Sequence, residues 1–343
     1  MICSLCTGTL LLYVAIGYLI ARFIWELLPI GDLSSKAVFI TGCDSGFGRS
    51  LAIKCAKNGM TVFAGCLTEE GQNSLKKEAA SLPLHVVPLD VTQDESVKKA
   101  REYVDKNLGS KKLWAVVNNA GIFTCYGMAD WCSIHEYQLS FEVNTLGGIR
   151  VTNAFVDLIK SSRGRIVSVS SVAGKVSLGG AAPYSVAKYG VEAWMDAVRR
   201  ELRVFGVQAI LLEPGAFKAT NLLDQEAMAK RVDSVWKKMN EEKKKEYGEE
   251  FKNKFVEGWN KTLQMTGSDN IAYVVDNYYH AITAKYPRSR YQCGWDAIFF
   301  YYPVSFLPTP IQDAIIGFLT SVTYGGYAPT AVQPGGKYHQ KTE

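Results

Sequence analysis

The sequence predicts an α/β fold: a single Rossmann-type, doubly wound parallel sheet preceded by an N-terminal membrane-anchor helix. Short apolar runs alternate with longer amphipathic segments across residues 35–294. The short runs VFIT, LWAVV and RIVSVS are nearly continuous and rich in β-branched residues, which is typical of parallel strands buried on both faces. An uncharged run of about 20 residues precedes this alternation, and about 20 apolar residues span a bilayer as a helix.

The uncharged run covers residues 2–21. A cleaved signal peptide would have a basic start and a small-residue cleavage site after a shorter core, and neither is clear here. We therefore interpret residues 1–28 as a retained membrane anchor, with a cleaved signal as the alternative. Arg22 and Lys36 follow the run, and positive charge tends to stay on the cytosolic side. The main domain is therefore expected to face the cytosol.

The elements expected after the anchor form a regular series. Strands are expected at residues 37–41, 60–66, 84–90, 113–118, 165–171 and 207–213. Helices are expected at residues 46–58, 69–80, 94–107 and 184–205, with another long helical stretch ending near residue 161. This alternation predicts a parallel sheet with right-handed crossovers and helices on both faces. Ligands bind such sheets at the carboxyl ends of the strands.

Composition and charge argue against several classes of function. The net charge of +5 is spread along the chain, so nucleic-acid binding is not expected. The eight cysteines form neither a disulfide framework nor paired zinc-ligand motifs, and free thiols suit a reducing compartment. The four histidines are isolated and no carboxylate cluster joins them, so no metal site is expected.

The stretch TGCDSGFG, from Thr41 to Gly48, lies between the first expected strand and the first expected helix. Gly42 would allow the sharp turn, Gly46 would let the backbone approach a pyrophosphate, and Gly48 would let the helix sit close to the sheet. The pyrophosphate would meet the helix N-terminus, where free N–H groups and the helix dipole favour anions. This context indicates a dinucleotide site.

Further motifs end at the same edge of the expected sheet. NNAG (118–121) ends the fourth strand, SVSS (168–171) ends the fifth, and EPG (213–215) ends the sixth. Tyr184 and Lys188 in YSVAK begin a helix, and because they are four residues apart they share one helical face. These polar groups and glycines are therefore expected to meet around one ligand.

Together these motifs resemble the short-chain dehydrogenase/reductase family. TGxxxGxG, NNAG, Ser–x12–YxxxK and PG in this order are highly specific, and the resemblance runs from residue 37 to about residue 220, more loosely to residue 294. Within the family, TGCDSGFG, FAGCLTEEG (63–71) and LDVT (89–92) are similar to the membrane-associated retinol and hydroxysteroid dehydrogenase branch. That branch also includes relatives that act on 3-hydroxybutyrate.

The resemblance implies a tyrosine acid/base mechanism. Tyrosine is a poor base because its pKa lies near 10, but a lysine ammonium one turn away favours the phenolate. Tyr184 is then the acid/base, while Lys188 lowers its pKa and bonds the nicotinamide ribose. Ser171 and Tyr184 hold the substrate oxygen, and Asn144 in FEVNTLGG orders a water that bridges to the lysine. YxxxK alone could be a surface pair, but all four positions in register favour catalysis.

The implied cofactor is NAD, with NADP as the less favoured alternative. Asp44 would repel a 2′-phosphate and could accept a ribose hydroxyl; alternatively it only caps local N–H groups. No Asp ends the second strand, and Ala219 replaces the threonine that often holds the carboxamide, with Thr220 next. The expected cofactor-binding residues are Thr41, Gly42, Asp44, Ser45, Gly46, Phe47, Gly48, Asp90, Val91, Asn118, Ala120, Gly121, Tyr184, Lys188, Pro214, Gly215, Phe217 and Thr220.

Residues 221–270 are expected to form a helical insert that covers the substrate. It carries an aromatic stripe with a four-residue repeat: Tyr247, Phe251, Phe255 and Trp259. The stripe could pack onto the body of the domain or close a hydrophobic pocket. Because membrane anchoring favours a lipid-soluble substrate, we expect hydride transfer between NAD and a lipophilic secondary or allylic alcohol, such as a sterol, steroid or retinol. The alternatives are a 3-hydroxybutyrate-type dehydrogenase, a catalytically silent nucleotide-binding membrane sensor, and a structural membrane protein with a borrowed Rossmann domain.

Residues 295–343 contain an apolar segment and a tail. Pro303, Pro308 and Pro310 interrupt the segment, so it is a poor spanning helix. It could pack on the domain or rest on the membrane surface. We expect an enzyme of the endoplasmic reticulum membrane with one N-terminal span, and the resemblance implies a homodimer paired through the helix at residues 184–205.

Overall fold

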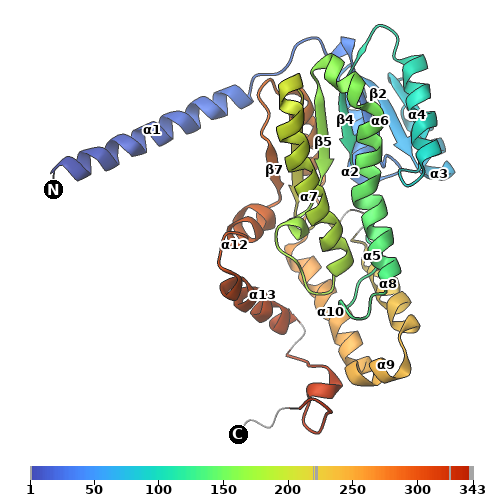
Figure 1. Cartoon of the computed structure of the whole chain (residues 1–343), viewed down its shortest axis with the longest axis vertical. Helices are drawn as coiled ribbons and strands as arrows, with labels where there is room; N and C mark the ends of the chain where they lie inside the picture. The colour runs from blue at the N-terminus through green and yellow to red at the C-terminus, as the bar shows by residue number, and fades with distance from the viewer. Residues whose placement is uncertain (1, 219, 221–222, 324–325, 340–343) are drawn as a thin grey trace.

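The computed structural model describes residues 2–218, 220, 223–323 and 326–339 (Figure 1). Within them, parallel strands form one sheet in the order β3-β2-β1-β4-β5-β6-β7. The strands are β1 (Lys36–Thr41), β2 (Thr61–Cys66), β3 (Leu84–Pro88), β4 (Lys112–Asn118), β5 (Arg165–Val169), β6 (Gln208–Pro214) and β7 (Arg290–Cys293). The strand order reverses between β1 and β4, and this switch point is where doubly wound sheets bind ligands.

The predicted parallel sheet is confirmed, with one strand more than expected. β7 pairs with β6 from Leu211↔Arg290 to Pro214↔Cys293. Its sequence RYQC lacks the apolar run that identifies the other strands, because it is a short edge strand with alternating burial. β7 matters for the site because the chain turns from it directly into the segment that closes the cavity described below.

Helices cover both faces of the sheet. One buried cluster joins side chains of the sheet to α2 (Gly46–Lys57), α3 (Glu69–Glu78) and α11 (Ala272–Thr283). A second cluster on the opposite face joins the sheet to α4 (Asp94–Asn107), α6 (Gly147–Ser162) and α7 (Ala182–Leu202). The strands are therefore buried on both sides, which explains their continuous apolar sequences.

A third cluster lies beyond the carboxyl edge of the sheet. The 221–270 region forms α8 (Gln225–Lys238), α9 (Glu241–Tyr247) and α10 (Glu249–Thr266). Met228, Trp236 and Phe255 pack there against Trp131 and Tyr126 of the β4–α5 connection; α5 covers Ile134–Phe141. The aromatic stripe therefore packs inward, and its helices lie over the site end of the sheet (Figure 1).

Both terminal regions lie outside these layers. α1 (Ile2–Glu26) extends away from the body (Figure 1), and its part Gly8–Glu26 is apolar and largely exposed, although Glu26 at its end is buried. After β7 come the π-helical turn Ala297–Tyr301, α12 (Tyr302–Val304) and α13 (Thr309–Thr323). By length and composition, α1 could cross a membrane, and among the described residues it is the helix that meets both criteria.

Candidate active site

The glycine loop turns sharply between β1 and α2. Gly42 has φ +71°, and an added Cβ there would lie 2.8 Å from Ala120 Cα of the next strand end. Gly46 has φ +60°, and an added Cβ would face open space. Because β1 ends at Thr41 and α2 begins at Gly46, the unpaired N–H groups of the first helical turn face this space. The loop therefore forms a cradle for an anion, as its motif predicts.

Thr41 and Asn119 hold the end of β4 against this loop. Thr41 Oγ1 accepts hydrogen bonds from Asn119 N at 3.0 Å and Ala120 N at 2.9 Å. Asn119 Nδ2 in turn donates to Thr41 O at 3.0 Å and to Gly42 O at 3.2 Å. Thr41 is buried and does not line the cavity; its side chain instead positions the backbone of the NNAG motif.

The α7 helix places Tyr184 and Lys188 on one buried face. Tyr184 is 9% exposed and Lys188 is 2% exposed. Burial raises the pKa of Tyr184 to about 12, while a hydrogen bond with Ser171 acts in the opposite direction. Burial lowers the pKa of Lys188 to about 8, and the charge of Glu192 opposes that shift. Both groups therefore resist ionisation, as catalytic groups in a dry cavity often do.

The lysine is oriented toward the sheet edge. Lys188 Nζ donates to Val169 O at 3.0 Å, at the end of β5, and lies 5.4 Å from the centre of the Tyr184 ring. A cation at this position favours the Tyr184 phenolate. Ser171 follows β5, where Ala173 N donates to its Oγ at 3.2 Å. Ser171, Tyr184 and Lys188 therefore meet as the sequence motif requires.

Asn144 lies in a π-helical turn, Glu142–Leu146, between α5 and α6. Its Nδ2 donates to Ile122 O at 3.0 Å and to Ser140 O at 2.9 Å, and its Oδ1 accepts from Ile122 N at 3.0 Å. A Cβ added at Gly121 would lie 2.8 Å from Asn144 Oδ1 and 3.8 Å from Lys188 Nζ. The missing side chain at Gly121 therefore keeps the space between Asn144 and the lysine open, and π-turns are frequent at functional sites.

Asp44 binds the connection after β2. Its Oδ1 accepts hydrogen bonds from Thr68 N at 2.8 Å and Thr68 Oγ1 at 2.7 Å, and its Oδ2 accepts from Leu67 N at 2.9 Å. The capping role considered as an alternative is therefore present. Asp44 is also one of the residues that line the cavity.

These groups surround a cavity of about 500 Å³. Most of the predicted cofactor and catalytic residues line it: Gly42, Asp44, Ser45, Gly46, Phe47, Ala120, Gly121, Asn144, Ser171, Tyr184, Lys188, Pro214, Gly215, Phe217 and Thr220. The other predicted residues do not line it: Thr41, Gly48, Asp90, Val91 and Asn118. Asn118 Nδ2, for example, donates to Thr152 Oγ1 at 2.9 Å and to Ser168 Oγ at 3.1 Å, inside the fold. Ala219 lies outside the described residues.

Several cavity residues were not predicted. Phe123 stacks on Tyr184 with ring centres 4.6 Å apart, and Tyr301 reaches the cavity from the segment after β7. Asp296 accepts a hydrogen bond from Ala216 N at 2.8 Å, and a Cβ at Gly215 would collide with its carboxylate. Burial raises the pKa of Asp296. The sequence motif identified Gly215, but Asp296 lies about 80 residues from this loop, and no sequence pattern indicated that the two segments meet.

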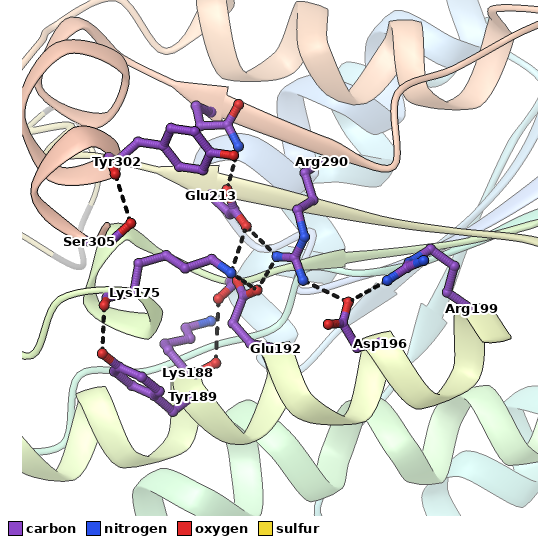
Figure 2. A network of polar contacts seen from close by, with 12 residues as sticks. Lys175, Lys188, Tyr189, Glu192, Asp196, Arg199, Glu213, Arg290, Tyr302 and Ser305 are labelled. Carbon is purple, nitrogen blue, oxygen red and sulfur yellow. Dashed lines mark hydrogen bonds and ion pairs between the residues drawn. The ribbon is translucent and has the colours of Figure 1, made fainter. Parts of the chain in front are cut away.

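An ion-pair network lies next to Lys188 (Figure 2). Lys175 Nζ lies 2.9 Å from Glu192 Oε2 and 3.5 Å from Glu213 Oε1. Arg290 of β7 pairs with Glu192, with Glu213 at 2.5 Å and with Asp196 at 2.6 Å. Glu192 is one turn after Lys188 on α7, and its buried Oε1 has no partner among the described residues. Through Glu192, the network brings a negative charge close to Lys188.

Comparison with known proteins identifies the family. The short chain dehydrogenase family model matches residues 36–231, which is more than half of the chain. The chain belongs to the short-chain dehydrogenase family. This dehydrogenase is 45% identical over 322 residues to "3beta-hydroxysteroid dehydrogenase dhs-16" of Caenorhabditis elegans, covering 92% of this chain and 82% of that protein. It is 41% identical over 307 residues to "Retinol dehydrogenase 7" of Rattus norvegicus, covering 87% and 96%.

A solved structure supports the fold of the dehydrogenase. The crystal structure of a short-chain dehydrogenase from Streptomyces avermitilis matches with a TM-score of 0.62 at 24% identity, covering 85% of this chain and 99% of that one. The predicted membership of the retinol and hydroxysteroid branch is also confirmed by the relatives. The dehydrogenase is therefore an oxidoreductase that uses a nicotinamide cofactor, as its family does.

Proposed function

We propose that the dehydrogenase transfers hydride between NAD and a lipophilic secondary or allylic alcohol, in the class of sterols, steroids and retinoids. The observation that carries this proposal is the cavity, in which buried Tyr184 and Lys188 share a space with apolar wall residues such as Phe123 and Leu263. Apolar walls favour a ligand whose one polar group meets the tyrosine. The names of the hydroxysteroid and retinol relatives support the same class of substrate.

Each catalytic side chain has a role that follows from its position. Ser171 and Tyr184 bind the alcohol oxygen, and the Tyr184 phenolate accepts the hydroxyl proton as the alcohol is oxidised. The Lys188 ammonium stabilises that phenolate across the 5.4 Å between Nζ and the ring centre. Asn144 holds the backbone of Ile122 and leaves room near Lys188 for a water. When bound, the nicotinamide ring supplies the acceptor for the hydride.

The residues of the cavity fit a dinucleotide. The turn at Gly42, the open space at Gly46 and the N-terminus of α2 form an anion cradle with no basic side chain needed. Lys188 and Asn144 line the same cavity, and they would bind the nicotinamide ribose. Thr220 also lines this space, although its Oγ1 donates to Phe217 O at 2.8 Å.

The preference for NAD rests on the charges near the glycine loop. Asp44 lines the cavity and carries a negative charge that would repel a 2′-phosphate. Arg49 is the nearest cation that follows the loop, but it binds Glu78 Oε2 through Nε at 2.8 Å and Ser74 Oγ through Nη1 at 2.7 Å. Glu78 therefore neutralises a side chain that could otherwise attract the phosphate of NADP.

Membrane attachment forms part of the same proposal. α1 is an exposed apolar helix of sufficient length to span a bilayer. We propose that it anchors the dehydrogenase in the endoplasmic reticulum membrane with the catalytic domain in the cytosol, because Arg22 and Lys36 flank its end. The exposed residues Val186 and Tyr189 of α7 support the proposed pairing of two copies through this helix.

A substrate panel in membranes tests this function. Full-length protein would be assayed with NAD or NADP and with retinol, a 3-hydroxysteroid, a 17-hydroxysteroid and 3-hydroxybutyrate. We expect NAD-dependent oxidation of at least one lipophilic alcohol and loss of that activity in Tyr184→Phe. Turnover of 3-hydroxybutyrate alone, or nucleotide binding without any turnover, would contradict the proposal. A higher kcat/KM with NADP would overturn the role given to Asp44.

A further inference from the structure

The segments that follow β7 expose a concentration of large apolar side chains. Trp295 is 80% exposed, Phe299 is 65% exposed and Phe306 is 72% exposed. On α13, Phe318 is 68% exposed and Val322 is 61% exposed. We call these five residues the C-terminal apolar surface. Such a concentration is unusual for surface facing water and marks a place of interaction.

The charge of this region suits a lipid surface. Between residues 291 and 336 the sequence has no Lys, Arg, Glu or His, and it has two aspartates. Asp296 points inward, where it accepts a hydrogen bond from Ala216 N. Asp313 is exposed at the start of α13. Few charges need to leave water when such a surface enters an apolar environment, so its insertion costs little.

The position of α1 identifies the partner. α12 and α13 lie on the side of the body toward which α1 extends (Figure 1). The base of α1 is fixed to the body, because Glu26 Oε2 accepts from Arg288 Nε at 2.8 Å and the ring of His280 meets Glu26 O at 2.8 Å. Arg288 stands just before β7, from which the C-terminal apolar surface follows. A membrane crossed by α1 would therefore meet this surface.

The length of α13 favours contact along the membrane instead of across it. Its 15 residues give a length of about 22 Å at ~1.5 Å per residue, shorter than the hydrocarbon core of about 30 Å. Pro308 and Pro310 stand at its start, and Asp313 lies within its first turns. Aromatic side chains such as Trp295 and Phe299 favour the depth of the lipid headgroups. These features fit a helix that lies in the interface plane.

The same segments form part of the cavity wall. Tyr301 lines the cavity, and in the sequence it stands between Phe299 and Phe306, whose side chains are exposed. Thr262 of α10 also lines the cavity, and its Oγ1 donates to Thr323 Oγ1 of α13 at 3.2 Å. The cavity wall is therefore linked directly to the segments that carry the apolar surface.

We propose that the C-terminal apolar surface rests in the bilayer interface beside α1, and that the substrate enters the cavity from the membrane between α10 and the 295–306 segment. The occupant of the surface is the lipid bilayer; a second copy of the chain is the competing occupant. The entry route rests on the proposed function, because it requires a lipophilic substrate. The membrane contact does not depend on that function and is tested separately.

Fluorescence quenching tests the contact in the full-length protein. The protein would be placed in phosphatidylcholine vesicles with or without brominated acyl chains, which quench tryptophans at the depth of the bromine. Trp25 is an exposed tryptophan at the body end of α1, where it could also be quenched, so Trp25→Phe serves as the background. We expect clear quenching in this variant and its loss when Trp295→Phe is added. Equal quenching with and without Trp295 would overturn the proposal, as would efficient cross-linking between two copies through Phe306→Cys in vesicles.

Kinetics with membrane-dissolved substrate test the entry route. The triple variant Phe299→Ser, Phe306→Ser, Phe318→Ser would be compared with a control triple at exposed apolar positions elsewhere, Ile134→Ser, Leu139→Ser and Val204→Ser. We expect about a tenfold rise in KM for an alcohol dissolved in vesicles only in the first variant, with kcat unchanged. Equal KM values in both variants would refute the route. If no alcohol turns over in unmodified protein, the proposed function fails while the quenching result still decides the membrane contact.

Discussion

Helix α7 buries charge in two different ways within three turns. At its beginning, Lys188 donates a hydrogen bond to the backbone carbonyl of Val169, and burial shifts the pKa values of both Lys188 and Tyr184. One turn later, Glu192 is surrounded by Lys175 and Arg290, which compensate its burial. The proposed catalytic pair therefore has pKa values shifted by burial, whereas the network is fixed by opposite charges. The network therefore supplies a rigid electrostatic background for the pair.

The largest expected effect comes from the tyrosine. Tyr184→Phe removes the group that accepts the alcohol proton, so we expect kcat to fall by about 10³-fold, within the range for loss of a general base. NAD binding should persist, because the glycine loop is unchanged. Tyr189→Phe, on the outer side of the same helix, is the control and should keep nearly full activity. Steady-state kinetics and calorimetric titration with NAD would measure the two effects.

Lys188→Met should separate activity from stability. Burial lowers the pKa of Lys188 from 10.5 to about 8, so the unfolded chain binds this proton more tightly than the folded chain does. This weakens folding fully below about pH 8, and the penalty disappears as the pH rises to about 10.5. We expect about 100-fold lower activity and, at pH 7, a free energy of unfolding higher by about 1–2 kcal/mol. Denaturant unfolding that shows a less stable variant would contradict this assignment.

Glu192→Gln should shift the pH dependence of activity. The groups facing Glu192 are Lys175, Arg290 and, through Arg290, Glu213 and Asp196. Loss of the negative charge lowers the pKa of Lys188 further below about 8. Because the phenolate then has a weaker cation beside it, the acidic limb of the kcat/KM profile for oxidation should move to higher pH by about one unit.

Two variants sharpen this test of the network. Glu192→Asp restores the charge and should return the profile toward that of the unmodified protein. Asp196→Asn removes a charge that pairs with Arg290 but lies one turn farther from Lys188. This variant should leave the pH of the acidic limb of the kcat/KM profile unchanged. If Glu192→Gln changes only the unfolding midpoint and not the profile, the network has no electrostatic role in catalysis.

The smallest expected effect concerns the cofactor. Glu78→Gln would release Arg49 beside the glycine loop, and we expect the ratio of NAD to NADP preference to fall by several-fold. Lys77→Gln, on the same helix, is the control. Titration with the two cofactors measures the effect. An unchanged ratio would place the discrimination in Asp44 alone.

The sequence allowed the sheet edge and its chemistry to be predicted in detail. The glycine loop, NNAG, Ser171 and the Tyr184–Lys188 spacing each act close to their own strand or helix, so local pattern is sufficient. The inward direction of Asn118 was not predictable, because it depends on Thr152 and Ser168 in other elements.

The remaining features of the site arise from contacts between distant segments. β7 has too short a run for a strand pattern, and Asp296 reaches Ala216 across 80 residues. The ion-pair network joins Lys175 in the β5–α7 connection to α7, β6 and β7, so none of its members is distinctive alone. Such sites depend on tertiary packing, which composition and periodicity do not encode locally.

The central claim is that hydride leaves the carbinol carbon of a lipophilic alcohol while Tyr184 takes the hydroxyl proton. The most direct measurement uses a steroid or retinoid alcohol deuterated at that carbon, incubated with NAD and the full-length dehydrogenase in vesicles. Mass spectrometry would follow the label. We predict one deuterium in the reduced cofactor with the unmodified protein, and none above background with Tyr184→Phe. Product formation without deuterium in the cofactor, or equal transfer in the variant, would contradict the account.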